Sequence, residues 1–326
     1  MTVRWCDRTT ARVVPDSGRH RPRSPGVDSY KSRPHHVPDS MHVLGVTDRG
    51  ATDDAVERVV DRVVDRLSRN GRVGVVRYDA TIADGTHASR PHEPIALGGD
   101  VTYDLGADGD WTATGTGMTV GDALDRLAID CDYAIVVGIS ELQHPTIAVG
   151  TDAATLEPDG DSLLAAVESP GELAADDVDA DLVDALEATE PYETLEALVE
   201  RVKRSPKADR SGAVATFTGR VRAKESEDDA RTEYLEFEKY EGVADERLAT
   251  IETELEEREG VLEVELYHRT GVVEDGEDIV FVVVLAGHRE EAFRTVEDGI
   301  NRLKDEVPLF KKEVTVEDEF WVHDRP

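Results

Sequence analysis

Apolar residues follow two different spacings along the chain after residue 41. Alternating or continuous apolar runs indicate β-strands, and apolar residues three or four positions apart indicate helices. Over residues 41–152 these patterns predict, in turn, a strand, a helix, a strand, a helix and a strand at His42–Val46, Asp53–Arg69, Arg72–Arg77, Thr119–Leu127 and Tyr133–Gly138. Strands that alternate with helices are typical of a parallel sheet covered by helices, so we predict an α/β domain here.

A second domain is predicted over residues 191–326. Apolar spacing indicates a helix near Leu195, followed by strands and two further helices. These are the strands Gly212–Arg222 and Tyr234–Glu238, the helix Ala244–Arg258, the strands Val261–His268 and Ile279–Ala286, and a last helix from Arg289 that Pro308 ends. Helices mixed with strands that neighbour one another in the sequence indicate the α+β class.

Two segments lack these patterns. Residues 1–40 are rich in proline and carry eight Arg or Lys against four Asp. They are predicted to form a disordered tail, and because a strand pattern begins directly after Met41, the natural start of the protein is interpreted as Met41. Residues 153–190 consist mainly of Ala, Asp, Glu and Leu, which predicts an acidic helical linker.

The composition is strongly acidic. The chain has 71 acidic and 37 basic residues, a formal charge of -34, and 39% hydrophobic residues. This charge argues against nucleic acids and anionic membranes as partners, while the periodic apolar segments argue against disorder of the whole chain. Arginine also outnumbers lysine, a pattern that resembles halophilic proteins from cytoplasm with molar salt, where the Debye length falls to about 3 Å.

The cysteines and the hydropathy indicate a cytoplasmic protein. Cys6 and Cys131 are far apart in dissimilar contexts, which does not suggest a disulfide framework. No apolar run approaches the roughly 20 residues that span a bilayer, and residues 1–40 lack the apolar core of a signal peptide. No spacing of His, Cys and Asp suggests a metal site.

A degenerate phosphate-binding loop follows the first predicted strand. The run GVTDRGAT has the spacing G-x-x-x-x-G-K-[ST], but Ala51 stands at the lysine position. The candidate nucleotide-binding residues are Gly45, Gly50 and Thr52. Residues 41–200 contain no lysine, and Asp53 and Asp54 would repel a phosphate, so we expect that nucleotide hydrolysis has been lost. A plain strand-to-helix turn remains the alternative interpretation.

This half of the chain resembles the P-loop protein of molybdopterin guanine dinucleotide biosynthesis. The likeness rests on the degenerate loop and on two later strands, DYAIVVG from Asp132 and PTIAV from Pro145. Val137 stands where that family usually has a glutamate. The resemblance implies a P-loop-like fold that serves as a scaffold. A nucleotide-dependent adaptor is the alternative, and Ala51 weighs against it.

Cations gather near the end of this acidic chain, between residues 287 and 313. They are His288, Arg289, Arg302, Lys304, Lys311 and Lys312, and they indicate a pocket for an anion. Lys304 follows Leu303 and lies four positions after Ile300, beside the apolar stripe of the last helix, where its stem can pack.

Five ordered motifs over residues 190–326 resemble the catalytic large subunit of molybdopterin synthase. They read GAVATFTGRVR, LEFEKY, HREEAF, LKDEVPLFKKE and FWV. Phe310 replaces a more frequent tryptophan. The resemblance implies a fold of the α/β-hammerhead type and transfer of two sulfurs to cyclic pyranopterin monophosphate, with no tightly bound cofactor. It also implies two kinds of partner, namely a small ubiquitin-like sulfur carrier with a C-terminal Gly-Gly thiocarboxylate and a second copy bound through the C-terminal domain.

The resemblance also implies roles for individual residues. Lys304 would be the catalytic amine, and Lys311 would bind the substrate phosphate or the carboxyl terminus of the sulfur carrier. The other substrate-binding candidates are Arg222, His288, Arg289, Phe217 and Arg325, of which the last matches an arginine that crosses the dimer interface. A binding module that captures the sulfur carrier without catalysis is the rival hypothesis, and it would not need both lysines.

Overall fold

The computed structural model describes most of the chain after residue 37. The described residues are 38–78, 101–106, 109–139, 142–151, 163–168, 176–224, 226–240, 242–316 and 319–322. The predicted tail therefore lies outside them except for residues 38–40. Among the described residues no helix has both the length and the apolarity that crossing a bilayer requires.

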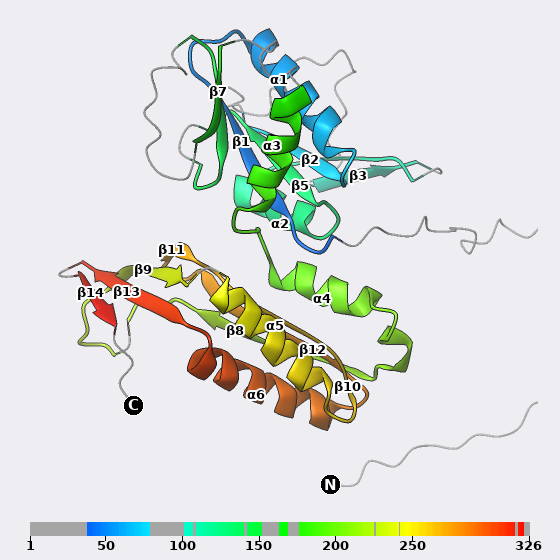
Figure 1. Cartoon of the computed structure of the whole chain (residues 1–326), viewed down its shortest axis with the longest axis vertical. Helices are drawn as coiled ribbons and strands as arrows, with labels where there is room; N and C mark the ends of the chain where they lie inside the picture. Colours follow the sequence, from blue (N-terminus) through cyan, green and yellow to red (C-terminus); the bar gives the residue numbers. More distant parts are fainter. Residues whose placement is uncertain are drawn as a thin grey trace, which may run out of the picture. The chain divides into compact units, whose positions relative to one another are not determined.

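A five-stranded sheet forms the first half of the fold (Figure 1). Its strands, in spatial order, are β2 (Val73–Arg77), β5 (Tyr133–Val137), β1 (His42–Asp48), β6 (Thr146–Val149) and β7 (Leu163–Val167). All neighbouring strands are parallel, which confirms the predicted class.

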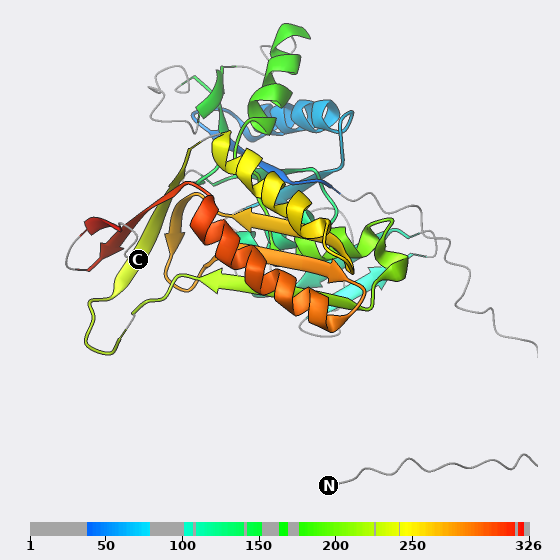
Figure 2. The ribbon, with the colours of Figure 1, turned by 60° about the horizontal axis from the view of Figure 1, so that its bottom comes forward.

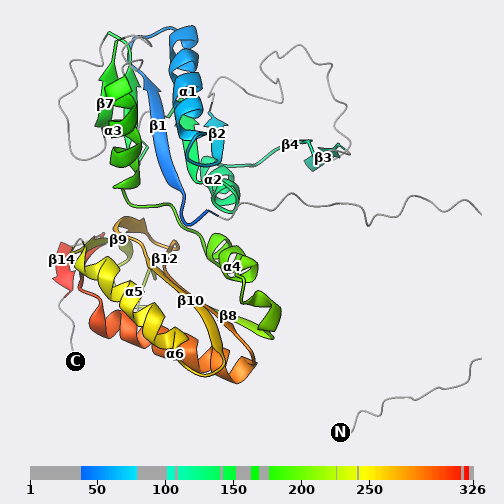
Figure 3. The same cartoon turned by 45° about the vertical axis from the view of Figure 1, so that its right-hand side comes forward.

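Helices cover both faces of this sheet (Figure 3). Successive residues of a strand point to opposite faces. Leu44 therefore packs with α1 (Asp53–Leu67) and α3 (Asp176–Glu187), whereas Val43 packs with α2 (Val120–Ala128). Burial on both faces explains why β1 and β5 are apolar without interruption.

The sheet continues past residue 152, where the sequence pattern predicted a linker. β7 pairs with β6, and Leu182, Val183 and Leu186 of α3 are buried in the same core as α1. The predicted helix is present, but β7 and α3, the elements described within this segment, belong to the parallel-sheet domain. Five apolar residues in acid-rich surroundings gave too weak a signal for a strand.

The sequence patterns also missed the antiparallel pair β3 (Val101–Leu105) and β4 (Trp111–Gly115).

Two antiparallel sheets and three helices form the second half (Figures 1 and 2). The first sheet has the order β10 (Val261–His268), β12 (Asp278–Ala286), β8 (Ala213–Arg220), and the second has the order β11 (Gly271–Glu274), β9 (Thr232–Lys239), β13 (Leu309–Thr315), β14 (Glu319–Val322). The helices are α4 (Leu195–Arg204), α5 (Val243–Glu256) and α6 (Arg289–Glu306), with a short 3-10 turn at Ala208–Arg210. This arrangement confirms the α+β class.

The central strand β12 is buried along nearly its whole length. One set of alternate residues, such as Val282, packs against α5 and α6, and the other set, such as Val283, packs against α4. Gly299 lets α6 lie close to this strand, because a Cβ there would approach Cγ1 of Val282 to 3.2 Å. Since α6 follows β12 and runs back along it, its C-terminal end lies where β8 ends and β12 begins (Figure 2).

Glu252 of α5 gives the second half a pH-dependent stability. Its Oε1 accepts a hydrogen bond from the Leu266 amide at 2.7 Å, and burial raises the carboxyl pKa from 4.5 to about 7. The folded protein favours the neutral form of this carboxyl, so its contribution to stability is fully present below the unfolded-state pKa of 4.5. That contribution is lost as the pH rises through the folded-state pKa of about 7. Glu252→Gln keeps an acceptor for Leu266 and removes the ionisation. At pH 8 we expect it to stabilise the protein by about 1 to 3 kcal/mol.

Thermal unfolding at pH 5 and pH 8 checks this prediction. The excess of the melting temperature of Glu252→Gln over that of the wild type should be much larger at pH 8 than at pH 5, where most of the pH-dependent loss has not yet occurred. Glu257→Gln, at an exposed position that follows the same helix, is the control and should change neither value. An equal shift of Glu252→Gln at both pH values would contradict the assignment.

Candidate functional site

Lys304 is an exposed amine in the last turn of α6. The helix positions four and three residues before it are Ile300 and Asn301, neither of which is charged, and α6 ends at Glu306 before the corresponding positions on the other side. Side chains at these spacings are the ones that meet on a helix surface. Within the described ranges, Nζ of Lys304 has no hydrogen bond or ion pair. Although the chain has 71 acidic residues, none of those that the structure describes forms an ion pair with this lysine.

Lys311 is a second unpaired amine among the described residues, and it lies half-buried on β13. It stands between Phe237 of β9 and Val322 of β14 in the sheet register. The adjacent Lys312 points to the opposite face, as alternation along a strand requires. There its Nζ lies 3.0 Å from Glu319, a hydrogen bond that raises the pKa of Lys312. One strand thus carries one unpaired and one paired lysine.

The end of β8 lies at the same edge of the sheet as the end of α6. Val221 anchors the chain here through its amide, which donates to the Glu277 carbonyl at 2.9 Å, and the next residue, Arg222, is exposed. Arg220, two residues earlier, pairs with Asp278, with its Nε 2.9 Å from the carboxylate. Phe217, in the middle of β8, is half-buried against the core beneath α6. The structure therefore places Arg222 and Lys304 at one end of the domain and Phe217 further along the same strand.

His288 and Arg289 lie at the other end of α6. His288 is the N-cap residue, but its side chain makes no capping hydrogen bond, and both side chains are exposed. Arg289 and Lys304 are fifteen positions apart (304 minus 289) on one continuous helix, a separation of about 22 Å at 1.5 Å per residue. A single chain does not bring these two groups of cations together.

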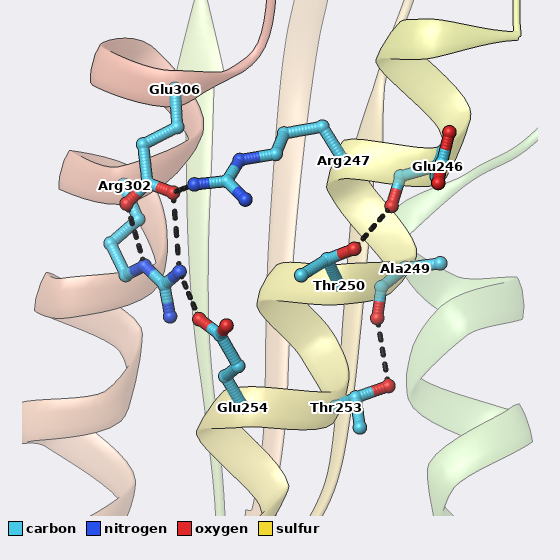
Figure 4. A network of polar contacts seen from close by, with 8 residues as sticks. All are labelled: Glu246, Arg247, Ala249, Thr250, Thr253, Glu254, Arg302 and Glu306. Atoms are coloured by element: carbon cyan, nitrogen blue, oxygen red, sulfur yellow. Dashed lines mark hydrogen bonds and ion pairs between the residues drawn. The ribbon is translucent and has the colours of Figure 1, made fainter.

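Arg302 does not contribute a cation to the expected anion pocket. Its Nε donates to Glu306 at 2.8 Å, and it also bonds Glu254 of α5 (Figure 4). The sequence grouped Arg302 with the other cations because its carboxylate partner on α5 lies 48 positions away. Arg325 lies outside the described residues. The described part of the chain holds no cluster of His, Cys, Asp and Glu that could bind a metal ion.

Each candidate residue of the degenerate loop has a structural task. Gly45 lies against β6, where a Cβ would approach Thr146 Oγ1 to 2.9 Å. Gly50 adopts a positive φ of 84°, which favours glycine. Thr52 caps α1, because its Oγ1 accepts from the Ala55 amide at 3.3 Å. The sequence did not single out Asp48, whose Oδ1 accepts from the Ala51 amide at 2.7 Å and so occupies a donor inside the loop.

We therefore expect the full chain to show no magnesium-dependent binding of GTP. The Asp48 carboxylate already holds one loop amide, and a phosphate there would meet this negative charge without a lysine to offset it. Equilibrium binding of a fluorescent GTP analogue measures this, with the double variant Asp48→Ser, Ala51→Lys as the comparison. Tight magnesium-dependent binding by the wild type would contradict the expectation.

Comparisons with known proteins find relatives for both parts of the chain. The family model described as MoaE protein matches residues 187–306. A probable molybdopterin synthase of Haloferax volcanii is 48% identical over 286 residues, which are 87% of this chain and 100% of the relative. The molybdopterin synthase catalytic subunit of Bacillus subtilis is 35% identical over 115 residues, or 35% of this chain and 72% of that protein. The crystal structure of a MobB protein homolog from Bacillus stearothermophilus covers 45% of this chain and 99% of its own, with 18% identity and a TM-score of 0.31.

Proposed function

Because the chain belongs to the molybdopterin synthase family, we propose that it transfers two sulfur atoms to cyclic pyranopterin monophosphate. The transfer opens the cyclic phosphate and creates the dithiolene of molybdopterin, a step of molybdenum cofactor biosynthesis. Each sulfur arrives as a thiocarboxylate at the C-terminal glycine of a small ubiquitin-like protein, which leaves with an ordinary carboxylate. This chemistry needs no redox cysteine and no tightly bound cofactor, and Cys131 lies buried in the other half of the chain.

One observation carries this proposal: Lys304 and Lys311 are two amines without carboxylate partners among the described residues. The turn at Val307 and Pro308 joins the helix of the first to the strand of the second. Unpaired positive charge in so acidic a protein marks a place where an external anion binds. The substrate phosphate and the carboxyl terminus of the sulfur carrier are both anions of this kind.

The proposed role of each residue follows from the chemistry of its side chain. Lys304 moves a proton to or from the reacting group as a general acid and base. Lys311 holds the phosphate or the sulfur carrier's terminus as a compact positive charge, and Arg222 adds a planar guanidinium suited to two-point contact with phosphate. Phe217 packs against the hydrophobic core on which α6 lies. Fixed positive charges of this kind stabilise the negative charge that develops as the ring phosphate opens.

We further propose that a second copy completes the site. His288 and Arg289 lie about 22 Å from Lys304 on the same helix, too far to contact one small substrate. In a two-fold dimer, each copy can supply these residues to the Lys304 end of the other. Phe320 is exposed on the face of β13 and β14 that carries Lys311, and Phe310 and Trp321 are exposed on the opposite face with Lys312. Both faces of this end therefore offer apolar surface to a protein partner.

The parallel-sheet domain is assigned a scaffolding role, because its loop is closed by Asp48 and Thr52. The rival function for the whole chain is a binding module that holds the sulfur carrier without catalysis. Both are tested by mixing the purified protein, in molar KCl, with cyclic pyranopterin monophosphate and a thiocarboxylated small subunit. Dithiolene formation supports the proposed reaction. Its absence from a folded protein that binds the small subunit would favour the binding module.

A further inference from the structure

Four charged side chains of α5 and α6 form one network beside the last turn of α6 (Figure 4). Arg302 donates to both carboxylate oxygens of Glu306, from Nε at 2.8 Å and from Nη2 at 3.2 Å. Arg302 also bonds Glu254, and Arg247 bonds Glu306. We call Arg247, Glu254, Arg302 and Glu306 the α5–α6 clamp. It contains two positive and two negative groups and is therefore neutral.

The clamp engages one flank of α6, and Lys304 occupies the other. Residues on a helix are about 100° apart, so Arg302 and Glu306 share a flank while Lys304, two positions from each, is turned by about 200°. Ile300 and Leu303 lie on the buried side between the two flanks. The clamp therefore contacts the side of α6 that faces away from Lys304 and leaves the Lys304 amine unbound by it.

Glu306 would be unfavourable at this position without the clamp. It is the last residue of α6, where the helix dipole repels a negative charge. Arg302 first, and Arg247 with it, hold the pKa of the Glu306 carboxyl below its ordinary value. Immediately afterwards the chain turns at Val307 into β13, which carries Lys311. The clamp thus lies at the junction between the elements of the two unpaired lysines.

We propose that the α5–α6 clamp, through Arg247, positions Lys304 relative to Lys311. The proposal rests on the proposed function, which gives these amines their catalytic task. Arg247 belongs to α5 and ties Glu306 to that helix, whereas Arg302 and Glu306 both belong to α6. Without Arg247 the clamp is tied to α5 only at Arg302, through Glu254, and the direct link at Glu306, one turn later, is lost. The residues after Arg302 then loosen, and the distance between the amines becomes variable. Arg247 is a positioning residue, because it acts through Glu306.

The variant Arg247→Gln tests this in the full chain, with Arg258→Gln as a matched control. Arg258 also links the end of α5 to α6, through Asp298 at 2.5 Å, but six positions before Lys304. We expect Arg247→Gln to lower kcat for dithiolene formation about five- to tenfold with KM for cyclic pyranopterin monophosphate unchanged. Arg258→Gln should leave both constants unchanged, and Arg247→Lys should restore most of kcat. Equal loss of kcat in the Gln variants would overturn the proposal.

Hydrogen exchange tests the clamp independently of activity. The Val307 amide donates to the Leu303 carbonyl at 3.1 Å and reports on the last turn of α6. In Arg247→Gln we expect amides of residues 303–307 to exchange at least about tenfold faster, with residues 292–298 unchanged. Unchanged exchange at 303–307 would overturn the proposal. A wild-type protein without activity would count against the proposed function. The exchange rates would still show whether the clamp holds the last turn of α6.

Discussion

Replacement of Lys304 by alanine is expected to lower the rate of dithiolene formation at least about a hundredfold, or roughly 2.7 kcal/mol of barrier. The physical reason is that, in the proposed mechanism, the amine supplies both a proton and a positive charge where negative charge develops. Lys304 is exposed and lacks a partner among the described residues, so its removal breaks no contact seen there. Single-turnover assays with saturating thiocarboxylated small subunit in molar KCl measure the effect.

Lys312→Ala is the matched control for this loss. Lys312 is also a lysine near the site, but it lies on the opposite face of β13 and is bonded to Glu319. We expect its replacement to change the rate by less than about threefold, since exposed ion pairs contribute little. A folded Lys304→Ala protein with nearly wild-type rate would remove Lys304 from the mechanism. Equal losses in both variants would indicate a general effect of positive charge.

Two inactive variants are expected to restore each other when mixed. Lys304→Ala damages one end of α6 and Arg289→Ala the other, about 22 Å away. In a mixed dimer, one of the two sites combines an intact Lys304 from one copy with an intact Arg289 from the other. With random pairing, half of the dimers are mixed and half of their sites are intact, so about a quarter of the wild-type activity should return.

A mixture of Lys304→Ala and Lys311→Ala controls for this restoration. Both changes lie at the same end of the domain, so every site in a mixed dimer lacks one of the two lysines. This mixture should stay inactive after subunit exchange under the same conditions. Activity from both mixtures, or from neither, would contradict a site shared between two copies.

The sequence predicts the elements whose signal is local. β12 reads as a continuous apolar run because both of its faces are buried, and α6 shows its apolar stripe and ends at Pro308. Lys304 and Lys311 stand out because lysine is scarce in this chain. These features depend on residues within a few positions of one another, so the spacing and the type of the residues are enough to predict them.

Other features depend on partners that are distant in the sequence. β7 is a strand because β6 lies beside it, and its five residues alone do not distinguish a strand from part of a helix. Arg302 has one partner that the sequence does show, Glu306 at i+4, and a second, Glu254, that only the packing of α5 against α6 brings to it. The separation of Arg289 from Lys304 follows from an uninterrupted helix, whereas the motifs present the two residues as members of one cluster. Only the folded chain shows which cations are paired and which ends of an element meet.

The mass of the product from a single turnover tests the central claim most directly. Wild-type protein in molar KCl is mixed with limiting cyclic pyranopterin monophosphate and excess thiocarboxylated small subunit. We expect a pterin that carries two new sulfurs and an opened phosphate, with two thiocarboxylates consumed per product. Substrate that remains unchanged while the folded protein holds the small subunit would contradict sulfur transfer by this chain.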